Sequence, residues 1–202
     1  MNLKEKATIL HYHRHRQESF DRGTTRALGW KNDYSQQMRY EVLAGVGDLN
    51  GCSVLDPGCG YGDLLAFLDE RFRDVDYTGL ELMPEFLEEA ARRFAQRGDC
   101  HFYLGDFSRM ELPRVDYVLA SGAFGYKTGD MTYYYRSIDR FYRASTKGLA
   151  FNMLDVAKFP DHPLLRGHDK EAVLTFCRTI CGKVECREGY LEDDFTVFMY
   201  KD

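Results

Sequence analysis

The stretch SVLDPGCGYGDLLAFL, residues 53–68, limits what this chain can fold into more than any other part of its sequence. An apolar run ends at Asp56, glycine fills three alternate positions, and a second apolar run begins after Asp63. This pattern is typical of a buried strand that turns tightly into a helix. The three glycines are Gly58, Gly60 and Gly62. Backbone N–H groups and the helix dipole favour a negatively charged group at such a turn, so we expect a ligand close to the backbone.

The spacing of these glycines argues against a dinucleotide. The fingerprint G-x-G-x-x-G requires its third glycine where this chain has Asp63, and that carboxylate would face a pyrophosphate. An acid before the loop, Asp56, instead suits a zwitterion whose ammonium lies near Asp56 and whose carboxylate lies near the loop amides. A tight turn without a ligand is the alternative, but three glycines lower stability without another purpose. A nicotinamide-dependent oxidoreductase therefore ranks last.

Short apolar runs alternate with segments of helical periodicity from residue 52 onward. This alternation predicts an α/β fold with a mostly parallel, seven-stranded sheet, and an acidic turn between the last two runs predicts a C-terminal antiparallel hairpin. Strands are expected at 53–56, 75–82, 100–106, 115–124, 148–155, 183–190 and 195–201. Helices are expected at 63–72, from Pro84 to a stop at Gly98, after Asp130, and from 172 to a stop at Gly182.

The first 50 residues lack this alternation. We expect them to form a helical cap (1–50) on an α/β core (51–202), the two making a single domain of residues 1–202. Ser35 is expected to cap a helix whose apolar face meets the sheet. The segment HYHRHR places His11 and His15 on one helix face, but no cysteine or carboxylate completes a metal site close by. We interpret it as an exposed helix and predict no metal.

Composition narrows the class of protein further. The net charge of −5 counts against a dedicated nucleic-acid-binding protein. Six cysteines without a C-x-x-C pair indicate reduced, mostly buried thiols. The N-terminus lacks the apolar region of a signal peptide, and no apolar run approaches the roughly 20 residues of a membrane helix. We therefore expect a soluble, cytoplasmic protein that binds neither membrane nor nucleic acid.

Two further acids end neighbouring strands of the predicted sheet. Glu81 closes the second strand, where its carboxylate can accept hydrogen bonds from both hydroxyls of a ribose. Asp106 follows the third strand and can accept a bond from the exocyclic amine of adenine, with the Phe107 amide near a ring nitrogen. Leu82 and Met83 can pack on the purine face. A solvated loop residue is the alternative for Glu81, and an Asx turn is the alternative for Asp106.

With these motifs, the chain resembles a class I S-adenosyl-L-methionine-dependent methyltransferase over about residues 50–201. VLDPGCGYG is similar to the first motif of that family, LEL to its second-strand acid, GDF to its adenine motif, and DYVLASGAF to the motif that borders the methyl-transfer site. Pro57 and Tyr61 depart from the commonest form of the first motif. The resemblance implies a three-layer Rossmann-like sandwich that binds S-adenosyl-L-methionine and releases S-adenosyl-L-homocysteine. The cofactor-binding residues that it implies are Asp56, Gly58, Cys59, Gly60, Tyr61, Gly62, Glu81, Leu82, Met83, Asp106, Phe107 and Ser121.

The acceptor is less constrained, because this family has no fixed catalytic residue. SGAF at 121–124 lacks the prolines of enzymes that methylate exocyclic base nitrogens or amide side chains. We therefore expect a small-molecule acceptor and a monomer or homodimer. An RNA or protein methyltransferase and a non-catalytic cofactor-binding protein are the alternatives. Candidate bases are Tyr126, Asp130, His162 and His168. The acceptor pocket could be walled by Tyr12, Phe20, 27–30 and 133–135.

Overall fold

The computed structural model describes residues 1–201 and contains one mixed β-sheet of order β3-β2-β1-β4-β5-β8-β7. Strands β1 to β5 pair in parallel, whereas β8 is antiparallel to both of its neighbours, β5 and β7. The predicted sheet and its terminal hairpin are therefore confirmed. The main strands are β1 (Ser53–Pro57), β2 (Asp76–Glu81), β3 (Cys100–Leu104), β4 (Val115–Ala120), β5 (Ser145–Asp155), β7 (Lys183–Glu188) and β8 (Asp194–Tyr200). A short strand, β6 (Gly167–His168), pairs with the end of β5.

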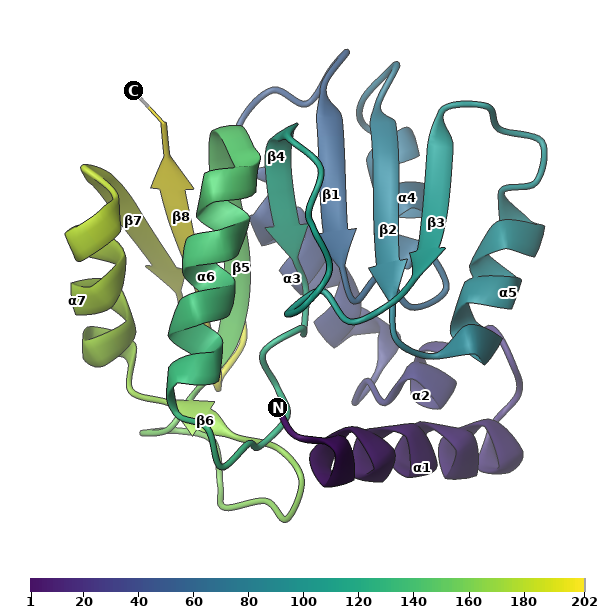
Figure 1. Ribbon diagram of the computed structural model, residues 1–202, viewed down its shortest axis with the longest axis horizontal. Coiled ribbons are helices and arrows are strands. Elements are labelled where there is room, and N and C mark those ends of the chain that lie inside the picture. Colours follow the sequence, from purple (N-terminus) through teal and green to yellow (C-terminus); the bar gives the residue numbers. More distant parts are fainter. Residues whose placement is uncertain (202) are drawn as a thin grey trace.

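Helices cover both faces of this sheet (Figure 1). Alternate residues of one strand point to opposite faces, so Leu55 of β1 lies in the core under α6 and α7, and Val54 lies in the core under α3 and α4. The result is the expected three-layer arrangement. The helices concerned are α3 (Asp33–Ala44), α4 (Asp63–Asp69), α5 (Pro84–Arg93), α6 (Thr132–Ala144) and α7 (Lys170–Ile180).

Three predicted helix boundaries were wrong. Helix α5 ends at Arg93 rather than near Gly98, because Phe94 leaves the helix and stacks on Phe102 of β3 with ring centroids 5.8 Å apart. Helix α4 ends at Asp69, three residues earlier than expected. Asn32, not Ser35, caps α3: its side-chain oxygen accepts the Ser35 amide at 2.8 Å. Ser35 thus occupies the first turn, where its N–H needs the cap.

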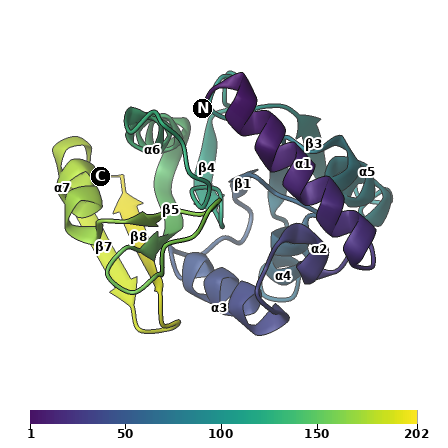
Figure 2. The same cartoon turned by 90° about the horizontal axis from the view of Figure 1, so that it is seen from below.

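The first 30 residues contain two helices, α1 (Leu3–Ser19) and α2 (Thr25–Leu28), which lie across the carboxyl ends of the central strands (Figures 1 and 2). A capping box between Asn2 and Glu5 starts α1. An apolar cluster attaches this segment to the ends of β1 and β2. The buried members of the cluster are Ala27, Tyr61, Met83 and Phe86. No helix within residues 1–201 is long and apolar enough to cross a lipid bilayer.

Candidate functional site

Three acidic residues gather at the carboxyl edge of the sheet. Asp56 lies at the end of β1, Glu81 is the last residue of β2, and Asp106 follows β3 by two residues. Because β1, β2 and β3 are parallel neighbours, their carboxyl ends meet at one edge. Asp56 and Glu81 are buried, and the side chain of Asp106 is 16% exposed. In open α/β sheets this edge is where ligands bind.

The glycine loop folds back onto the end of β2. The amides of Gly58 and Cys59 both donate to the Leu80 carbonyl, at 2.7 and 3.1 Å, and the Gly60 amide donates to Glu81 Oε2 at 2.9 Å. Gly58, Gly60 and Gly62 have φ values of +89°, +57° and +76°, a region that side chains disfavour. The amides of Gly58, Cys59 and Gly60 therefore form hydrogen bonds within the protein and are not directed at a ligand. In this respect the loop differs from the anion-binding turn that the sequence predicts.

Asp56 has one satisfied oxygen and one unsatisfied oxygen. Its Oδ2 accepts the Tyr77 hydroxyl at 2.6 Å, whereas Oδ1 is buried and accepts no hydrogen bond within residues 1–201. Burial raises the pKa of Asp56 to about 7, against the opposing effect of the Tyr77 hydrogen bond, and the nearby Glu81 adds to the rise. A buried acceptor without a partner costs stability, and a cationic donor would satisfy it.

Glu81 is held by backbone amides on both carboxylate oxygens. Oε1 accepts the amides of Leu82 and Met83 at 2.7 and 2.8 Å, and Oε2 accepts Gly60. Burial nevertheless raises the pKa of this carboxyl group. Oε1 uses both of its lone pairs for these amides, whereas Oε2 accepts one amide, so the fixed carboxylate retains acceptor capacity for a hydroxyl group at Oε2.

Asp106 forms an Asx turn and also an ion pair. Oδ1 accepts the Ser108 amide at 2.9 Å and the Ser108 hydroxyl at 2.6 Å, whereas Oδ2 faces the ammonium group of Lys6 on α1. Burial alone would raise the pKa of Asp106, but Lys6 and Ser108 together hold it below its ordinary value. The sequence carried no signal for Lys6, which belongs to a helix with no clear apolar periodicity.

The other residues implied by the resemblance surround this edge in different ways. Tyr61 is fully buried, packs on Phe86 at 4.9 Å, and its oxygen lies 3.4 Å from Gln17 Nε2. Met83 is buried in the same apolar cluster, Leu82 is half-buried, and the Cys59 thiol packs in the core on the α3 and α4 side. Phe107 directs its ring toward Phe141 of α6. Ser121 is buried, with its hydroxyl 3.5 Å from Asn152 Nδ2.

Of the four candidate bases, three are occupied by local contacts. His162 Nδ1 accepts the amides of Leu164 and Leu165. Asp130 accepts hydrogen bonds from Thr132 and Arg136 at the start of α6, and His168 Nε2 donates to the Phe124 carbonyl at 3.0 Å. Tyr126 differs, because its hydroxyl lies 2.5 Å from Nε2 of His13, a residue that sequence reasoning passed over.

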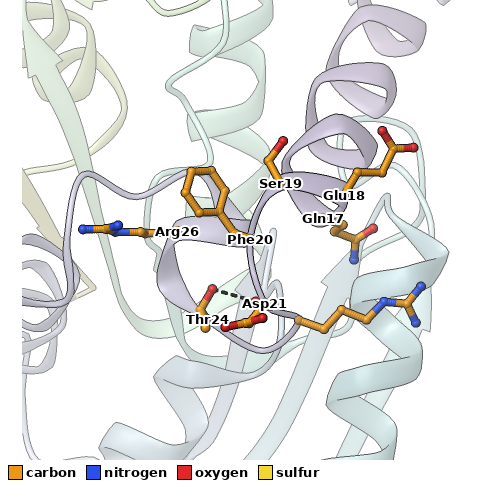
Figure 3. Close-up of a pocket in the computed structure, with 8 residues that line it drawn as sticks. Gln17, Glu18, Ser19, Phe20, Asp21, Thr24 and Arg26 are labelled. Atoms are coloured by element: carbon orange, nitrogen blue, oxygen red, sulfur yellow. Dashed lines mark hydrogen bonds between the residues drawn. The ribbon is translucent and has the colours of Figure 1, made fainter.

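Residues of the cap cover the acidic edge. A Cβ atom on Gly60 would lie 2.9 Å from Leu28, and one on Gly122 would lie 3.4 Å from Trp30. Two surface hollows lie near the cap: one of about 540 Å³ in the α1–α2 turn (Figure 3), and one of about 500 Å³ between α1, Ser108 and α6. Neither hollow is lined by Asp56 or Glu81.

Comparison with known proteins defines the class. Residues 54–145 match the model of a methyltransferase domain. A provisionally named methyltransferase of Mycobacterium tuberculosis is 32% identical over 159 residues, which cover 74% of this chain and 93% of that protein. A magnesium-protoporphyrin O-methyltransferase of Rhodobacter capsulatus is 33% identical over 94 residues, 46% of this chain and 38% of that protein. The chain therefore belongs to the class I S-adenosylmethionine-dependent methyltransferases.

Solved structures agree in fold. Magnesium protoporphyrin IX methyltransferase from Synechocystis PCC 6803 with bound S-adenosylhomocysteine superposes with a TM-score of 0.72 at 16% identity, covering 98% of this chain and 100% of that one. N-methyltransferase NodS from Bradyrhizobium japonicum WM9, also with S-adenosylhomocysteine, gives 0.72 at 16% identity and covers 95% and 97%. The protein is thus an S-adenosylmethionine-dependent enzyme of Rossmann-like fold.

Proposed function

We propose that the enzyme transfers a methyl group from S-adenosylmethionine to a small-molecule acceptor at the carboxyl edge of the sheet. The observation that carries this proposal is the buried Oδ1 of Asp56, which has no hydrogen-bond partner within residues 1–201 and lies beside the glycine loop. An ammonium group is the donor that this oxygen lacks, and the amino-acid end of the cofactor carries one. The residues at the edge therefore fit this cofactor.

The remaining edge residues would hold the other parts of the cofactor. We assign the ribose hydroxyls to Glu81 and the adenine amine to Asp106, with the Phe107 amide near a ring nitrogen. Leu82 and Met83 supply apolar contact to the purine. Gly58, Gly60 and Gly62 leave three positions of the loop without a side chain, and Cys59, Tyr61 and Ser121 complete the surroundings of the cofactor. When bound, the cofactor supplies an activated methyl group and its own leaving group, so the protein contributes mainly orientation and electrostatics.

We propose that two charge changes at this edge accompany cofactor binding. The Asp56 carboxyl group ionises beside the ammonium, because an opposite charge offsets the burial that raises its pKa. The Lys6 ammonium moves away from Asp106 as α1 shifts to admit the adenine. Residues 1–50 therefore act as a cap on the core of residues 51–202 within one domain.

Several observations support a small acceptor over RNA or protein. The chain is acidic, with a net charge of −5. Residues 1–30 of the cap lie across the carboxyl ends of the central strands (Figure 2). Two similar proteins are named for small acceptors: magnesium-protoporphyrin O-methyltransferase and fatty-acid O-methyltransferase. We propose a cytoplasmic enzyme acting as a monomer or homodimer.

Calorimetric titration with S-adenosylhomocysteine tests the proposal. The wild-type protein should bind it, and Asp56→Asn and Glu81→Gln should each weaken binding at least tenfold, since each removes a charge-assisted contact. Asp76→Asn is the matched control, because this exposed acid lies at the opposite end of β2. NAD should give no heat. Equal affinities for wild type and Asp56→Asn would contradict the assignment of the site.

A further inference from the structure

His13 and Tyr126 form a buried polar contact in the interface between the cap and the core. His13 lies on α1 and is 7% exposed, and its Nε2 is 2.5 Å from the Tyr126 hydroxyl. The other ring nitrogen, Nδ1, is buried and has no hydrogen-bond partner among the described residues. A histidine that only supports packing normally has both nitrogens satisfied, because an unpaired buried nitrogen costs free energy.

The surroundings of His13 keep its ring neutral. Its ring contacts Phe86 and Tyr12 at centroid distances of 5.0 and 5.2 Å, and the charged neighbour is Arg16 on the same helix. Burial, with a smaller effect of Arg16, lowers the pKa of His13 to about 4. Glu81 is the carboxylate close enough to Tyr126 to raise the pKa of its hydroxyl further, after burial and Tyr12.

The pair also lies above the edge where the cofactor is placed. Phe86 joins His13 to the glycine loop, because its ring contacts both His13 and Tyr61. Tyr126 is fixed from the core: its carbonyl accepts the Tyr134 hydroxyl at 2.6 Å, and its backbone forms a β-bridge with Leu165. His13 therefore belongs to the cap, whereas its partner is attached to the core.

From this geometry we infer that His13 accepts the proton of a hydroxyl-bearing, largely apolar acceptor, with Tyr126 as the residue that positions its ring. The inference rests on the proposed function. Nε2–H donates to the Tyr126 oxygen, which leaves the Nδ1 lone pair free for the acceptor. The acceptor oxygen forms its bond to the methyl carbon, the carbon–sulfur bond breaks with its electron pair left on sulfur, and the hydroxyl proton passes to Nδ1.

The charge balance of this step suits a buried imidazole. One positive charge disappears as the sulfonium becomes a thioether, and one appears on His13, so the net charge of the enclosed site does not change. The desolvation that keeps His13 neutral in the resting protein is therefore offset during transfer. The aromatic neighbours Phe86 and Tyr12 favour an apolar acceptor, and a carboxylic acid, already ionised at neutral pH, would need no base.

Methyl transfer from labelled S-adenosylmethionine to matched sets of phenols, aliphatic alcohols and carboxylic acids tests the inference. Hydroxyl compounds should be the acceptors, and His13→Gln should lower kcat for them by about 10²- to 10⁴-fold, the usual contribution of a general base. Tyr126→Phe should lower kcat about tenfold and shift its pH profile. His11→Gln and His15→Gln, exposed on the same helix, should match the wild type. Transfer to carboxylic acids alone, or full activity of His13→Gln, would overturn the inference.

A second measurement does not depend on turnover or on the acceptor. In ¹⁵N NMR spectra of the S-adenosylhomocysteine complex at neutral pH, the His13 signals, identified by their loss in His13→Gln, should show a protonated Nε2 and an unprotonated Nδ1. A protonated Nδ1 would overturn the assignment. Calorimetry on the same samples separates this failure from a failure of the proposed function, because binding of S-adenosylhomocysteine is measured independently.

Discussion

The ammonium of Lys6, on the first helix, pairs with the carboxylate of Asp106 at the end of the third strand. Both side chains are mostly buried, at 14% and 16% exposure. The pair attaches α1 to the part of the edge that we assign to adenine. The ammonium of Lys6 and an adenine amine would compete for the same oxygen of Asp106. We therefore expect the position of the cap and the binding of the cofactor to be coupled.

Replacing Lys6 should therefore strengthen cofactor binding. In Lys6→Gln the Asp106 oxygen loses its competing cation, and we expect S-adenosylhomocysteine to bind about three- to tenfold more tightly, mainly through faster association. The effect is limited because a partly exposed ion pair contributes on the order of 1 kcal/mol. Calorimetry and stopped-flow fluorescence measure it, with the exposed Lys4→Gln as control. Weaker binding by Lys6→Gln would mean that Lys6 assists adenine rather than competing with it.

Cofactor affinity should depend on pH through Asp56. Burial raises the pKa of this group to about 7 in the free protein, and a bound ammonium favours its ionised form. Below pH 7 binding must therefore release a proton, so affinity should rise with pH up to about 7, by as much as tenfold per pH unit, and level off above it. Glu81 acts in the same direction, because burial raises its pKa also.

Titrations with S-adenosylhomocysteine between pH 5 and 8 measure this dependence. In Asp56→Asn the affinity should be lower and the slope flatter, because the amide does not ionise. An affinity of the wild type that falls as pH rises through this range would contradict the placement of the ammonium at Asp56.

The free energy of unfolding of the free protein should depend on pH through His13. Its pKa is about 4 in the folded protein and 6.5 in its ordinary state. Between these values the unfolded chain binds a proton that the native protein does not, so the free energy of unfolding falls as pH falls from 6.5 to 4, by roughly 3 kcal/mol in all. The contribution of Asp56 to the pH dependence of stability has the opposite sign. Its raised pKa means that the native protein, not the unfolded chain, binds the extra proton up to about pH 7.

Comparison with His13→Gln isolates the histidine contribution. Urea unfolding at a series of pH values should show that the difference in stability between wild type and His13→Gln shrinks as pH falls from 6.5 to 4. A difference that stays constant with pH would show that His13 titrates normally in the native protein.

Tyr61 should matter for both the cofactor and the fold. It is fully buried and packs on Phe86, so Tyr61→Ala should cost about 3 to 5 kcal/mol of stability and weaken S-adenosylhomocysteine binding by opening the loop. Tyr61→Phe is the matched control: it keeps the ring and removes the hydroxyl, which interacts with Gln17 and with the Gly23 backbone. An unchanged dissociation constant in Tyr61→Ala, measured where the variant is folded, would refute a role beside the cofactor.

Much of the sheet and its acidic edge could be predicted because the signals are local. Asp56 precedes a glycine turn, Glu81 ends the next apolar run, and Asp106 follows the third, so the parallel pairing of these strands places all three at one edge. Their roles toward the cofactor stay predictions. Helix ends were less predictable, since Phe94 leaves α5 to stack on Phe102 before the glycine that was expected to stop it.

The sequence by itself determined the class of fold, the mostly parallel sheet with its C-terminal antiparallel hairpin, and the identity of the acids at the carboxyl edge. Only the tertiary structure decided what covers them. Lys6 meets Asp106 across 100 residues, and His13 meets Tyr126 across 113. No periodicity or motif in the first 30 residues predicts these contacts, because they depend on how a polar helix packs against the folded sheet. That docking depends on long-range apolar packing around Ala27 and Phe86, which local patterns do not encode.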